Sequence, residues 1–165
     1  MKYHKLTAGE TTGTYVMESP VTEADILQMA QQLAMSRLSK GRVLTEPKHV
    51  ISHLQSLLQY HEYEVFALLL LDIKHRVIGF RELFRSTLDG ASVYPWEVVK
   101  IALEHNAAAV ILVHNHPSGD PEPSQADRTL TTTLKNALSM IGTQTLDHIV
   151  VGSEGCVSLA DRGYL

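Results

Sequence analysis

Two histidines and one aspartate stand at a spacing that suits a bound metal ion. Residues 114–127 read HNHPSGDPEPSQAD, so His114 and His116 form a His-x-His pair and Asp127 follows after ten intervening residues. Three protein ligands, with a fourth position left to water, make up a catalytic zinc site. The chain has one cysteine, Cys156, which excludes a zinc cluster of thiolates. Imidazole and carboxylate suit zinc, although the spacing alone leaves other divalent metals open.

The segments on either side predict how these ligands meet. The apolar run at residues 107–113 (AAAVILV) predicts a buried strand. Residues two apart on a strand point to the same side, about 6.5 Å from each other. His114 and His116 can therefore converge on one ion. A helix predicted over residues 124–141 brings Asp127 in from the other side.

Each of these residues also has an ordinary structural interpretation. A single loop histidine is usually just solvated, and this chain has nine histidines. Ser124 and Asp127 have the spacing of a capping box, in which the helix dipole favours the carboxylate. Taken together, on a strand, a loop and a helix, the residues favour a metal site.

A zinc site that activates water also needs a base. Zinc lowers the pKa of water toward ~7, and a carboxylate can accept its proton and pass it to a leaving amine. Glu64 begins an apolar strand and can sit at the end of a sheet. Glu82 shares a face with Ile78, Phe80 and Phe84 at period two, an unusual place for a charge. The ordinary interpretations are a solvated strand end for Glu64 and a strand misread by one register for Glu82.

The first 60 residues predict an arm and two helices. Residues 1–21 are polar and predict a loosely structured arm. Thr22 and Asp25 then have the spacing of a capping box, and the helix they open ends near Gly41. A second helix begins near Pro47, a favoured residue in the first turn.

The rest of the chain predicts strands and helices in alternation. Asp89 and Gly90 mark a turn, and a helix runs from Pro95 to about His105. Strands are predicted at residues 64–72, 76–85, 109–113, 147–151 and 156–159. Helices interspersed with a hairpin and later strands predict an α/β fold, a mixed sheet flanked by helices.

Composition argues against several classes of protein. A formal net charge of -4 argues against a broad surface for nucleic acid. The N-terminus has no apolar h-region, and the longest apolar run, at residues 65–71, is too short to span a bilayer. One cysteine fits a reducing compartment, where it would be a small buried residue of a late strand. We expect a cytoplasmic protein that does not bind a membrane.

These motifs resemble a known family. HNHPSG followed by PSxxD resembles the JAMM motif (also MPN+ or JAB), in the form carried by bacterial RadC-like proteins. The resemblance extends over residues 45–165, through EVFALLLLD, ELFRSTLDGASVYP, EVVKIALEHNAAAVIL and LDHIVVG. It implies the three-layer architecture of JAB/MPN domains, similar to cytidine deaminases, with residues 1–44 as an N-terminal arm and lead-in helix. RadC proteins commonly carry a helix-hairpin-helix segment, for which this chain is too short.

The resemblance also implies roles for the site residues. It makes His114, His116 and Asp127 the ligands of one zinc ion, and Ser124 the hydrogen-bond donor to the oxyanion of a tetrahedral intermediate. Glu64 is the better match to the family's catalytic glutamate, and Glu82 stays the alternative.

Two further features complete the comparison with the family. Asp147 and His148 match a family signature that implies support of the ligands, with a turn at the start of a strand as the ordinary interpretation. Trp96 stands where relatives often have Arg, which should affect the surface near the site and not the zinc.

The expected activity is zinc-dependent hydrolysis of a peptide or isopeptide amide bond. The partner is then an unidentified protein or peptide substrate, and the oligomeric state is not predicted. Two alternatives are a non-enzymatic interaction module of the JAB fold and an accessory protein of DNA repair. The full ligand set argues against the first, and the mildly acidic charge argues against the second.

Overall fold

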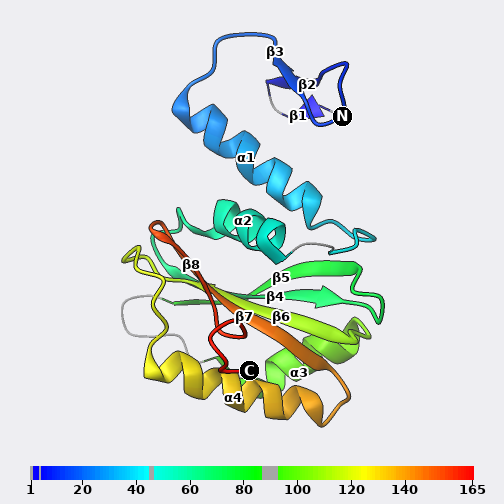
Figure 1. The fold of residues 1–165 in the computed structure, drawn as a ribbon, viewed down its shortest axis with the longest axis vertical. Helices are drawn as coiled ribbons and strands as arrows, with labels where there is room; N and C mark the ends of the chain where they lie inside the picture. Colours follow the sequence, from blue (N-terminus) through cyan, green and yellow to red (C-terminus); the bar gives the residue numbers. More distant parts are fainter. Residues whose placement is uncertain (1, 4, 45–46, 87–92) are drawn as a thin grey trace.

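The computed structural model describes residues 2–3, 5–44, 47–86 and 93–165, and its centre is a five-stranded mixed sheet (Figure 1). The strand order is β5-β4-β6-β7-β8. In chain order the strands are β4 (Glu64–Leu71), β5 (Val77–Ser86), β6 (Ala109–Asn115), β7 (Gln144–Gly152) and β8 (Gly155–Ser158). Helix α2 (Pro47–Leu58) covers one face, and α3 (Pro95–Glu104) and α4 (Gln125–Ser139) cover the other. The predicted fold class is therefore confirmed.

Strands β4 and β6 are buried on both faces, which is why each contains a continuous apolar run, residues 65–71 in β4 and 109–113 in β6. Every residue of β6 is buried, and in β4 only Glu64 is partly exposed. Alternate residues of β4 face opposite layers. Leu69 packs in the same cluster as Leu58 of α2, and Leu68 packs in the cluster that contains Leu134 of α4.

The connection through α4 brings three element ends together. Strands β6 and β7 run parallel, so the chain must cross a face of the sheet between them, and α4 makes that crossing. The first turn of α4 therefore lies at the same end of the sheet as the end of β6. Because β4 runs antiparallel to β6, its start lies at the same end of the sheet.

Strand β5 corrects the prediction for Glu82. Phe84 pairs with Phe66 of β4, but Glu82 pairs with Ala67, because the register shifts between these two pairs. Glu82 and Phe84 therefore point to opposite faces, and Glu82 lies on the α2 side with Ala67. A second shift lies further along β5. The predicted common face of Ile78, Phe80, Glu82 and Phe84 is thus wrong, because bulges interrupt the alternation.

The N-terminal residues form a small sheet of their own. Residues 1–21 were expected to be a loosely structured arm, but they contain β1 (Lys2–Tyr3), β2 (Leu6–Ala8) and β3 (Tyr15–Met17), in the order β1-β2-β3. Helix α1 (Glu23–Arg37) begins with the predicted capping box of Thr22 and Asp25 and packs against α2. In Figure 1 this part lies beyond α2, away from the five-stranded sheet.

The structure confirms the predicted start of α3 and the predicted late strand of Cys156. Pro95 begins α3 as expected, and Cys156 lies in the late strand β8. Burial raises the pKa of the Cys156 thiol to about 11. The turn predicted at Asp89 and Gly90 lies outside the described residues. Among the residues that the structure describes, no helix is both long and apolar enough to span a membrane.

The loop after β6 is fixed by a close approach of two glycines. Gly119 has φ of +94°, which favours glycine, and its carbonyl accepts the N–H of Glu154 at 3.1 Å. At Gly152, the last residue of β7, a methyl group would overlap this same carbonyl. The loop that carries His116 therefore needs a glycine at position 152.

We expect Gly152→Ala to destabilise the fold by about 1–3 kcal/mol, because the methyl group forces the backbone of the loop away from β7. Urea unfolding followed by circular dichroism measures the change. Gly79→Ala is the matched control, because its methyl group would meet only the Arg81 guanidinium, 3.5 Å away. Equal unfolding midpoints for the two variants would contradict the expected clash.

Candidate metal centre

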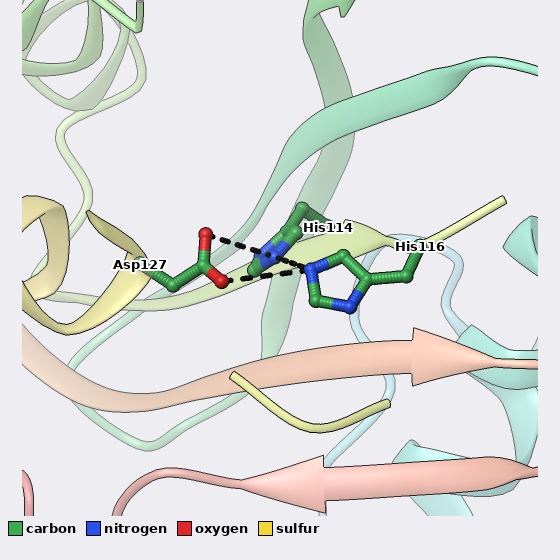
Figure 2. A group of neighbouring side chains, drawn as sticks. All are labelled: His114, His116 and Asp127. Carbon is green, nitrogen blue, oxygen red and sulfur yellow. Dashed lines mark hydrogen bonds and ion pairs between the residues drawn. The ribbon is translucent and has the colours of Figure 1, made fainter. Parts of the chain in front are cut away.

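The three predicted ligands lie together at the end of β6 (Figure 2). His114 belongs to β6, His116 follows its last residue, and Asp127 lies in the first turn of α4. The two Nε2 atoms are 3.0 Å apart. Oδ1 of Asp127 is 3.4 Å from Nε2 of His114, and Oδ2 is 3.5 Å from Nε2 of His116. One ligand atom from each of the three residues lies within 4.8 Å of the other two, and these three atoms form a small triangle.

The size of this triangle fits a zinc ion. With zinc–nitrogen and zinc–oxygen distances of about 2.0–2.2 Å, ligand atoms at the corners of a tetrahedron are ~3.3–3.5 Å apart. Nε2 of His114 and Nε2 of His116 each lie close to this distance from one oxygen of Asp127, at 3.4 Å from Oδ1 and 3.5 Å from Oδ2, and the two Nε2 atoms are slightly closer to each other, at 3.0 Å. One corner of such a tetrahedron is left open to water or substrate.

A buried chain of hydrogen bonds fixes the tautomer of His114. The Thr131 hydroxyl donates to the backbone carbonyl of Asp127 at 2.6 Å, so its oxygen can only accept from Nδ1 of His148, also at 2.6 Å. Nε2 of His148 then has no proton and accepts from Nδ1 of His114 at 2.8 Å. Nε2 of His114 is therefore left with a free lone pair, which faces the centre of the triangle.

A backbone carbonyl fixes the tautomer of His116 in the same way. Its Nδ1 lies 2.9 Å from the carbonyl oxygen of Asp120, an acceptor, so Nδ1 carries the proton. Nε2 again offers its lone pair toward Asp127. Ligating imidazoles usually donate their second N–H to such an acceptor, which orients the ring and raises its basicity.

The electrostatics of the cluster favour an ionised Asp127. Burial opposes its charge, but in the metal-free site protonated His114 and His116 can donate to it through Nε2, and these hydrogen bonds outweigh burial and hold the pKa of Asp127 well below the usual range. The hydrogen bond to Asp127 raises the pKa of His116, with burial acting against it. Burial and the neighbouring His114 hold the pKa of His148 well below its usual value, so the central imidazole of the chain is neutral.

Ser124 caps α4 and also bonds the carboxylate of Asp127. It is the N-cap of α4, and its Oγ accepts the N–H of Asp127 at 3.1 Å, so the capping box is confirmed. Its hydroxyl and its backbone N–H each donate to Oδ2 of Asp127 at 2.7 Å. The same side chain therefore caps the helix and lies beside the triangle.

The two candidate bases lie on opposite faces of the sheet. Phe66 pairs with His114 and lies on the same face, and Glu64, two residues before Phe66 on β4, lies on that face as well. Its charge contributes to the raised pKa of His116. Glu82 lies on the α2 face and is paired with Arg85 at 2.9 Å.

Three neighbours of the site were predicted only in part or not at all. His148 was expected to support the ligands, and it contacts His114 directly, whereas Asp147 bonds Ser158 and Ala160 instead. Thr131 was not predicted, although a threonine four residues after Asp127 on a buried helix face is a usable signal. Asn115 was expected to point away from the ion, and nothing was inferred from it.

Trp96 lies at the outer end of a row of aromatic rings. Phe66 contacts both His114 and Phe84, Phe84 contacts Tyr94, and Tyr94 contacts Trp96. The Trp96 side chain is 62% exposed. It therefore belongs to the surface and does not reach the triangle through its own contacts.

Comparison with known proteins agrees with this geometry. The sequence profile described as the RadC-like JAB domain matches residues 44–164. Proteins named UPF0758 from Shewanella baltica, Shewanella putrefaciens and Shewanella oneidensis are each 55% identical to the chain over 138 residues. These alignments cover 84% of the chain and 61% of each relative. The chain thus spans less than two thirds of the length of these bacterial relatives. Because the profile covers most of its length, the chain belongs to the family of RadC-like JAB domain proteins.

Proposed function

We propose that the chain is a zinc-dependent hydrolase that cleaves a peptide or isopeptide amide bond. The observation that carries the proposal is the convergence of two imidazole lone pairs and one carboxylate, with both tautomers fixed by hydrogen bonds, the one at His114 being buried. One zinc ion per chain fits this donor set. The position of Glu64 on the same face supports hydrolysis rather than structural zinc binding, since a structural site needs no base.

Each residue of the site has its own role in the proposed reaction. A zinc ion held by His114, His116 and Asp127 supplies a Lewis acid that polarises the amide carbonyl and activates water. Glu64 accepts the proton of the attacking water and delivers it to the departing amine as the C–N bond breaks. The Ser124 hydroxyl donates to the oxyanion. When the hydroxyl turns from Asp127 to the oxyanion, the backbone N–H of Ser124 still donates to the Asp127 carboxylate.

We expect the purified protein to hold one zinc ion and Thr131→Val to weaken zinc binding about 10–100-fold, because His148 loses the partner that fixes its tautomer. His114→Ala and Asp127→Ala should abolish binding. Competition with a chromophoric chelator measures the affinity.

Thr133→Val is the matched control, because Thr133 makes the same kind of bond to the carbonyl four residues earlier but is exposed. Equal affinities for the two valine variants would contradict the hydrogen-bond chain. A well-folded wild type that binds no metal would favour the interaction module, and steeply salt-dependent DNA binding would favour the accessory role in DNA repair.

We expect Glu64→Gln to keep one zinc per chain and to lower turnover about 10²–10⁴-fold, because the amide cannot accept a proton. The inactive variant serves as a trap, since bound substrate co-purifies with it and is identified by mass spectrometry. Cleavage of that captured protein by the wild type then measures turnover. Glu82→Gln is the control and should cleave normally. A dead Glu82→Gln with an active Glu64→Gln would show that the base is wrongly assigned.

We expect zinc affinity to fall at acidic pH. The pKa of His116 is raised and that of Asp127 is lowered, so His116 takes up a proton first as the pH falls. A protonated imidazole has no lone pair for the ion. Affinity should therefore be level above the raised pKa of His116 and drop below it, by about tenfold per pH unit for each proton displaced. Isothermal titration calorimetry at several pH values tests this, and a constant affinity into the acidic range would contradict it.

A further inference from the structure

The side chain of Asn115 lies between two strands at the end of β6. It is 1% exposed. Its Nδ2 donates to the backbone carbonyl of Tyr63 at 3.1 Å, and its Oδ1 accepts the backbone N–H of Val65 at 2.7 Å. One partner can only accept and the other can only donate, so the orientation of the amide is fixed. The residue between these two partners is Glu64.

This amide stands where the two strands would otherwise bond through their backbones. The register of β4 with β6 runs from the pair of Phe66 and His114 into the sheet. One step outward would pair Val65 with Asn115, but the N–H of Val65 is bonded to the side chain of Asn115 instead. A side-chain amide therefore takes the place of a backbone hydrogen bond at this end of the two strands.

The spacing matters because Glu64 would stand across from His116 if the pairing of Phe66 with His114 continued outward in regular register. In a regular antiparallel pair, directly opposite residues have Cβ atoms about 4.5–5.5 Å apart. At that distance the Glu64 carboxylate could reach the ion that His116 binds. A fourth protein ligand would then close the position that a catalytic zinc site keeps open.

We propose that Asn115 is a positioning residue that acts through Glu64. Its amide spaces β4 from β6 and holds the Glu64 carboxylate outside the ligand set, where it faces the open position. The inference deepens the proposed function and rests on it. A purely structural role is the competing explanation, because any buried polar backbone group needs a partner. The two explanations differ in whether the effect of Asn115 depends on Glu64.

A double-mutant cycle on zinc affinity separates these explanations. The four proteins are the wild type, Asn115→Ala, Glu64→Gln and the variant with both changes. We expect Asn115→Ala to tighten zinc binding about 10-fold while Glu64 is present, because the Glu64 carboxylate then joins the ligands; this is the low end of the range by which groups around a ligand shell change metal affinity. In the Glu64→Gln background the same substitution should change the affinity less than twofold. Chelator competition at neutral pH gives all four dissociation constants without any substrate.

A second variant checks that the result does not arise from damage to the fold. Asn115→Asp has the same shape and still accepts from Val65, but it loses the donor to Tyr63, so it should show the same dependence on Glu64. Thr143→Val is the matched control, because Thr143 is also buried and donates to the carbonyl of Ala107 at 2.9 Å, just before the start of β6. It should leave zinc affinity unchanged in both backgrounds.

Each outcome decides the inference. A tightening of zinc binding by Asn115→Ala that disappears in the Glu64→Gln background supports it. A weakening of zinc binding by Asn115→Ala overturns it. Equal effects in both backgrounds, or no effect in either, would overturn it and leave Asn115 a structural role only, with the proposed function intact. A wild type that binds no zinc overturns the proposed function and this inference together.

Discussion

The site depends on one constraint, which is that polar side chains are buried at the end of a strand without access to water. His114, Asn115 and His148 are each almost completely buried. A buried polar group without a partner costs about 1–3 kcal/mol, so each must find a hydrogen bond within the protein. The available partners lie on β4, β7 and α4, and the bonds that result fix how these three elements meet.

The same bonds organise the ligands before any ion arrives. Thr131 is bonded both to the backbone of Asp127 and to His148, so the helix turn that carries one ligand is tied to the imidazole that orients another. Ser124 caps the helix and holds the Asp127 carboxylate at once. Preorganised ligands bind an ion with less loss of side-chain freedom. Helix stability and ligand geometry thus come from the same contacts.

Much of the fold and the ligand set could be predicted because their signals are local. Apolar runs indicated β4 and β6, and the capping boxes at Thr22 and Ser124 indicated the starts of α1 and α4. The spacing of His114 and His116 indicated a shared face. The prediction for β5 was wrong, because a register shift depends on the partner strand and leaves no clear trace in the alternation of apolar residues.

The sequence by itself determined the element types, the two capping boxes and the three residues that can bind an ion, since each depends on neighbours a few positions away. Only the tertiary structure decided that Glu64 and Glu82 lie on opposite faces, that His148 contacts His114, and that the Asn115 side chain bonds the backbone of β4. These facts depend on strand register and on hydrogen bonds between residues that are 34 to 52 positions apart in the chain. The physical reason is that a buried donor bonds whichever acceptor the packed layers bring to it, and sequence spacing does not fix that choice.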